Sequence, residues 1–141
     1  MKKKMYWISL SYILLGLVAG VVNHEVAYWT NFTGKSVMSV VHPHAIILGG
    51  LVFLLLPLLM NNFALEDKKS FRGFLWTYNI GLVMTLGFMI ARGMSQLLVK
   101  PFPSFMDHMV GGLAGIGHII LTVGIGFLFY SLIKTAEPQK N

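Results

Sequence analysis

Four long apolar stretches dominate this 141-residue chain and decide the environment in which it can fold. They cover residues 5–27, 37–60, 74–99 and 109–133. Each reaches the ~20 residues that a helix needs to cross a hydrocarbon layer of ~30 Å. Only 11% of the residues are charged, whereas a soluble domain carries about 25%. The sequence therefore predicts an all-α membrane protein whose helices contact the lipid bilayer.

The connections between these stretches are short, and short connections favour helices that run alternately up and down. We therefore expect a single domain over residues 1–141, built as a bundle of four transmembrane helices. The helices should cover about residues 5–27, 37–60, 73–99 and 105–134.

The basic residues are unevenly placed on this arrangement. Only Lys35 and Lys100 fall in the loops on one side, and eight basic residues fall on the other: Lys2, Lys3, Lys4, Lys68, Lys69, Arg72, Lys134 and Lys140. Cytoplasmic loops carry the excess of lysine and arginine, so both termini are predicted inside, in a bacterial cytoplasmic membrane. The net charge of +6 thus orients the chain and does not indicate a nucleic-acid partner.

The candidate functional residues are histidines and one arginine. The chain has no cysteine, which excludes disulfides, thiolate ligands and thiol catalysis. Counting 1.5 Å per residue puts His42, His44, His118 and Arg92, from three helices, at one level in the outer half of the membrane. Ionisable groups at such a depth are costly, so they are candidates for function by default.

Two further patterns describe how these residues point. His42 and His44 are two positions apart, which separates them by about 200° around a regular helix, so they more naturally serve two different sites. Pro43 between them removes a helical hydrogen bond and can change the aim of both rings. On the last helix, one face carries Gly111, Gly115, His118 and Thr122, and is poor in bulk above the histidine.

A b-type haem would use this arrangement. Haem iron commonly takes imidazole ligands from opposing helices, and glycines let the macrocycle approach a backbone. We expect His44 and His118 to form the ligand pair, with His42 serving a second site, although the sequence leaves the choice between His42 and His44 open. Gly111 and Gly115 would flank the macrocycle, and Arg92 could pair with a propionate. Such a haem protein would serve in electron transfer, as a component of an oxidoreductase, or in the sensing of haem or a gas.

Two alternatives account for the same residues. His42, His44 and His118 could bind copper or zinc as a metal-binding or transport module. They could also make only interhelical hydrogen bonds in a cofactor-free structural subunit, with the glycines serving helix packing. For a haem-binding chain we also expect a homodimer, because four helices bury little surface and the second histidine of the His42–His44 pair needs a partner.

Several segments resemble one family over nearly the whole chain: "GLVAGV", "FTGKSVMSVVHPHAIILGG", "ARG" and "GLAGIGHIIL". They are similar to short bacterial membrane proteins grouped as domain of unknown function 2871. That resemblance implies four membrane helices and carries no assigned activity.

A more local resemblance concerns the two histidines. A histidine-any-histidine motif on one membrane helix is similar to that of the catalytic subunit of haem-copper oxidases. There the two histidines serve two different haems, and a histidine from another helix completes a bis-histidine site. Carried over, His42 and His44 match the pair and His118 stands for the opposing ligand. The further histidines and the tyrosine of the oxidase copper site cannot be placed, so the resemblance implies haem binding rather than oxygen reduction.

Overall fold

The computed structural model describes residues 1–136 and contains four helical spans. The first is α1 (Lys2–Trp29). The second is continuous over Met38–Asn62 and is divided into α2 (Met38–His44), a π-helical segment η1 (Ala45–Leu51) and α3 (Val52–Asn62). The last two are α4 (Lys69–Leu97) and α5 (Ser104–Ala136). All four spans are long and apolar enough to cross a membrane, so the predicted all-α architecture is confirmed.

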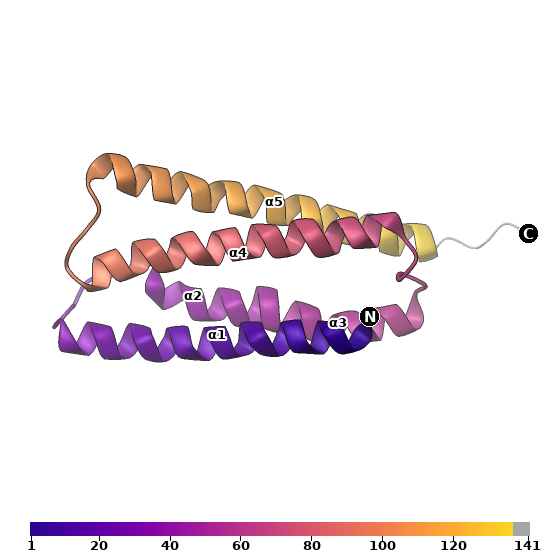
Figure 1. Ribbon diagram of the computed structural model, residues 1–141, viewed down its shortest axis with the longest axis horizontal. Helices are drawn as coiled ribbons and strands as arrows, with labels where there is room; N and C mark the ends of the chain where they lie inside the picture. The colour runs from indigo at the N-terminus through magenta and orange to yellow at the C-terminus, as the bar shows by residue number, and fades with distance from the viewer. Residues whose placement is uncertain (137–141) are drawn as a thin grey trace, which may run out of the picture.

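The four spans run alternately up and down, as Figure 1 shows. The N-terminus, the connection between α3 and α4 and the last turn of α5 lie at one end. The connections α1–α2 and α4–α5 lie at the other, which we call the distal end. The distal end is the one predicted to face outward, since Lys35 and Lys100 lie in its connections. Lys140 lies outside the described residues.

The helices differ by a few residues from the apolar stretches that predicted them. Most extend past the expected bounds, because backbone hydrogen bonding continues into the interfacial region, where polar side chains are tolerated. Two distal ends are exceptions: the second span begins at Met38 instead of residue 37, and the third ends at Leu97 instead of residue 99. Val99 adopts a left-handed backbone conformation with φ of 53°, which ends the helix.

The core lies between α1, the second span and α4, and its centre is aromatic. Phe53, Phe74 and Tyr78 are fully buried there, with ring centres 5.1–6.5 Å apart. Such offset and edge contacts add to the stabilisation that burial alone provides. This cluster fixes the second span against α4 and thereby sets the position of the residues on either side of Pro43.

The π-helical segment follows directly after His44. Its wider turn is seen where the Val52 N–H bonds to the Ile47 carbonyl, five residues back. Two carbonyls of the segment accept hydrogen bonds from neighbouring helices: the Tyr78 hydroxyl donates to Leu48 (2.9 Å), and the Ser9 hydroxyl donates to Gly50 (2.7 Å). The segment is therefore held in place by α4 and α1.

The last helix, α5, packs on α4 alone among the described helices. Small residues carry this contact: a methyl group at Gly117 would lie 2.6 Å from Thr85 Oγ1, and one at Gly124 would lie 2.8 Å from the Tyr78 nitrogen. Close backbone approach of this kind is the usual way in which membrane helices associate. The rest of α5 is left facing outward or toward α2.

Replacing Gly117 by valine should loosen α5 from α4. The added methyl groups collide with Thr85, and overpacking of this kind costs about 1–3 kcal/mol. We expect a lower thermal midpoint in detergent, measured by the loss of monodisperse protein on heating. Gly126→Val is the matched control, because a methyl group there meets nothing within 4 Å. Equal midpoints for the two variants would contradict this account of the α4–α5 contact.

Candidate functional site

His44 of the second span and His118 of α5 face each other across the gap between their helices. Their ring centres are 6.2 Å apart and the ring planes are at 87°. The two helices themselves stay apart, since α5 has no Cα atom within 8 Å of one in α2. Only side chains therefore bridge this space at the level of the two histidines.

Both rings are held by their own helices in the same way. The Nδ1 atom of His44 lies 2.7 Å from the Val40 carbonyl, and that of His118 lies 2.8 Å from the Ala114 carbonyl. A carbonyl oxygen can only accept, so each Nδ1 carries a proton, and in the neutral ring Nε2 keeps its lone pair. A backbone carbonyl on the other ring nitrogen is a common way to orient a metal-ligating histidine.

The separation of the rings suits a single metal ion between them. Two imidazoles that ligate one ion from opposite sides have their centres about 6 Å apart, because each bond is about 2.0–2.1 Å long and the nitrogen lies about 1.1 Å from the ring centre. The observed 6.2 Å agrees with that value. The arrangement can therefore supply two trans ligands to one ion.

Each histidine has small or apolar residues beside it on its own helix. A hollow of about 260 Å³ lies against His44 and is bordered by Val40, Pro43 and Ile47. On α5, a methyl group at Gly112 or Gly115 would meet nothing within 4 Å. The glycines that pack α5 on α4 are thus different from Gly115, which borders open space.

His42 faces another helix. Its side chain is exposed and lies beside Gly20 of α1, where an added methyl group would be 3.7 Å from the His42 Cβ. The two histidines of the motif therefore point to different neighbours, His42 to α1 and His44 to α5. Within residues 1–136, no group of three or more histidine, cysteine, aspartate or glutamate side chains could hold a metal ion, so His42 does not join the other two.

Arg92 lies at the distal end of α4 and is engaged by Asp107 of α5. Its Nε and Nη2 atoms donate to the two carboxylate oxygens, at 2.8 and 2.6 Å. The third nitrogen, Nη1, lies outside this pair, 3.5 Å from the position that a Cβ would take at Gly111. Asp107 thus balances the charge of Arg92 and occupies two of its three guanidinium nitrogens, so the expected pairing with a propionate stays a prediction for Nη1.

Asp107 is a residue that the sequence reasoning missed. It lies in the first turn of α5, where an acidic side chain is also favoured by the helix dipole. A signal was present: Glu25 and Asp107 are the two acidic residues predicted on the outer side, and Asp107 is the one that follows Arg92 across a short loop.

Thr122, on the same face of α5 as His118, is exposed and donates to the His118 carbonyl at 2.8 Å.

Comparisons with known proteins place the chain in a family but suggest no activity. No curated protein and no solved structure matches the sequence. One family model matches residues 1–135, nearly the whole chain, and its description is "protein of unknown function (DUF2871)". On that match, the chain belongs to the DUF2871 family.

Proposed function

We propose that this multi-pass membrane protein binds one b-type haem between α2 and α5, with His44 and His118 as axial ligands, and that it transfers electrons. One observation carries the proposal: two imidazoles from separate helices stand 6.2 Å apart, and each is oriented through Nδ1 by its own backbone. With no cysteine in the chain, covalent attachment of the haem through thioethers is excluded.

Haem suits the pair better than a bare ion does. A structural or catalytic zinc site takes three or four protein ligands, and the described residues offer no group of that size. A porphyrin supplies four ring nitrogens itself, so two histidines complete six-coordinate iron. The Cα atoms of α2 and α5 stay more than 8 Å apart, so only side chains occupy the place that the macrocycle would take.

A purely structural role is also less well supported. Two histidines that served to join helices would donate or accept hydrogen bonds across the gap. In the part of the chain that the structure describes, both Nδ1 atoms bond within their own helices, and no hydrogen bond joins the two rings. The two rings therefore lack the interhelical hydrogen bond that a structural role would require.

Arg92 would serve the haem through its remaining nitrogen. Gly111 lies seven residues before His118, so Nη1 stands about 10 Å toward the distal end on nearly the same face of α5. A propionate that extends toward the distal end would meet this nitrogen, while Asp107 holds the guanidinium in position. The propionates would thus point to the outer surface of a bacterial cytoplasmic membrane, with both termini inside.

Two histidine ligands leave no open position on the iron, which favours electron transfer over gas binding. The homodimer expected from the sequence stays a prediction. The flank of α5 that does not contact α4 is the surface that a second copy would cover.

An optical spectrum of the purified protein tests the proposal. After expression with a supply of haem, we expect a Soret band, a sharp α band on reduction with dithionite, and one b-type haem per chain by pyridine haemochrome analysis. The absence of a Soret band, together with no spectral change on adding haemin, would overturn the proposal. Stoichiometric copper or zinc in place of haem would favour the metal-binding alternative.

A further inference from the structure

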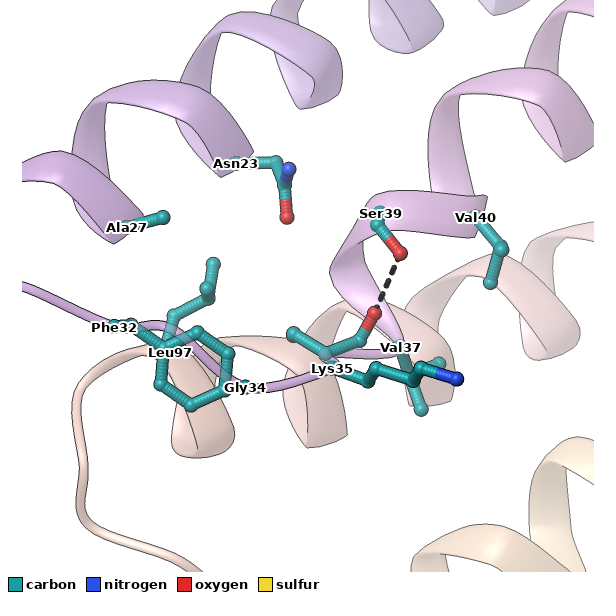
Figure 2. A pocket seen from close by; sticks show the side chains of 10 residues that line it. Asn23, Ala27, Phe32, Gly34, Lys35, Val37, Ser39, Val40 and Leu97 are labelled. Atoms are coloured by element: carbon teal, nitrogen blue, oxygen red, sulfur yellow. Dashed lines mark hydrogen bonds between the residues drawn. The ribbon is translucent and has the colours of Figure 1, made fainter.

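A second cavity lies at the distal end, between α1, the connection that follows it and the start of the second span. Its volume is about 500 Å³. Figure 2 shows the Asn23 amide directed into it from α1, and Phe32 and Leu97 on its other side. Ser39 also borders it, and the Ser39 hydroxyl donates to the Ser36 carbonyl at 2.7 Å. The cavity therefore offers polar groups on one side and an apolar, partly aromatic wall on the other.

This cavity adjoins two other hollows through lining residues that it shares with them. It shares Asn23, Ala27 and Phe32 with a neighbouring hollow of about 430 Å³ that is also lined by His24. It shares Val40 with the hollow that lies against His44. Val40 thus borders both the cavity and the space beside His44.

We propose that the cavity binds the ring of a membrane quinol, which donates electrons to the haem. The inference rests on the proposed function, because it assigns an electron donor to that haem. A quinol ring has the required chemistry: an uncharged aromatic body with a hydroxyl at each end. Asn23 can donate to or accept from one hydroxyl, and the lone pairs of Ser39 Oγ can accept from it, while Phe32 and Leu97 contact the ring.

A phospholipid headgroup fits the cavity less well. A phosphate would need a cation at the polar side, and Lys35 is the only charged residue in the lining. Figure 2 shows the Lys35 ammonium directed away from Asn23. The polar groups that face the cavity are therefore neutral, as an uncharged ligand requires.

The reaction balances with one further partner. Oxidation of one quinol to quinone breaks two O–H bonds and releases two protons and two electrons. A haem held by His44 and His118 would accept one electron at a time, so a one-electron acceptor would have to remove the first before the second could follow. The protons leave toward the distal surface, where the exposed His24 ring, 3.1 Å from the Glu25 carboxylate, lines the neighbouring hollow.

Rapid mixing of the full-length, haem-loaded ferric protein with decylubiquinol under anaerobic conditions tests this inference. We expect the wild-type α band to appear without dithionite. Ala27→Trp places a ring in the cavity and should slow this reduction by about tenfold or more, because the ligand is excluded. Val18→Trp, on the lipid-facing side of α1, is the matched control and should reduce at the wild-type rate.

A second variant protects the test against misfolding. Asn23→Leu keeps the size of the side chain but removes its hydrogen bonds, and should also slow reduction by quinol, whereas Asn62→Leu at the opposite end should not. Haem that is reduced by dithionite but not by decylubiquinol would overturn this inference and leave the proposed function standing. Wild-type rates in both cavity variants, with loss of a co-purifying phospholipid, would also overturn it. A missing Soret band would overturn both proposals.

Discussion

Replacing His44 or His118 by alanine is expected to remove the haem. Each variant takes away one of two axial ligands that approach from separate helices, 6.2 Å apart between ring centres. Even the loss of an outer-shell partner of a metal ligand lowers affinity by about 10–100-fold, so loss of the ligand itself should cost at least about 100-fold. The measurement is the Soret absorbance per mole of protein, followed by titration of the apoprotein with haemin.

His42→Ala is the matched control, because this residue lies on the same turn but faces α1. We expect it to keep the full haem content and the wild-type spectrum. His118→Met distinguishes an iron ligand from a structural residue. A thioether ligand should preserve six-coordinate iron and raise its reduction potential, whereas replacing a purely structural histidine would leave that potential unchanged. Full haem content in both His44→Ala and His118→Ala, or its loss in His42→Ala alone, would contradict the assignment.

The angle between the two rings gives a spectroscopic signature for the same pair. Imidazole planes at 87° leave two iron d orbitals nearly equal in energy. The ferric wild-type protein should therefore give a strongly anisotropic low-spin signal in electron paramagnetic resonance. A rhombic low-spin signal would indicate parallel rings and would contradict the observed ring geometry.

The spans and the shared level of His44 and His118 along the bundle could be predicted from the sequence, because both depend on counting. An apolar run of sufficient length specifies a membrane helix, and a fixed rise per residue then gives the level of each polar group. The spacing of His42 and His44 also predicted two directions, since that follows from the helical repeat.

The choice between the two histidines could not be predicted, because it depends on how the second span is rotated. That rotation is set by packing partners far away in sequence. The His42 side chain packs beside Gly20 of α1, and the Tyr78 and Ser9 hydroxyls hold the π-helical segment that follows His44. The segment itself has no clear signal in "AIILGGL", which reads as ordinary apolar helix.

The role of the glycines on α5 was similarly ambiguous. Small residues at helical spacing serve packing or make room for a ligand, and the sequence does not separate these uses. The structure divides them: Gly117 and Gly124 contact α4 closely, whereas Gly115 borders open space. The same limit applies to Arg92, because its partner Asp107 lies on a neighbouring helix and a local sequence pattern does not show such a pair.

Replacing Gly115 by leucine is expected to prevent haem binding without unfolding the protein. The new side chain meets nothing within 4 Å at its Cβ, so the α4–α5 contact should persist. Helical side chains tilt toward the N-terminus, so this leucine would cover the surface between His118 and Arg92. In the proposed complex, that surface lies under the half of the macrocycle that carries the propionates. We expect haem content to fall by about tenfold or more, as for a ligand excluded from its site.

Gly126→Leu separates this steric effect from a general effect of leucine on α5. Gly126 also borders open space and lies eleven residues further along, within about 20° of the same face but about 16 Å deeper. It should keep the wild-type haem content, and both variants should melt near the wild-type temperature. If Gly115→Leu bound haem as well as Gly126→Leu does, the macrocycle could not lie against this part of α5, and the two histidines would need another explanation.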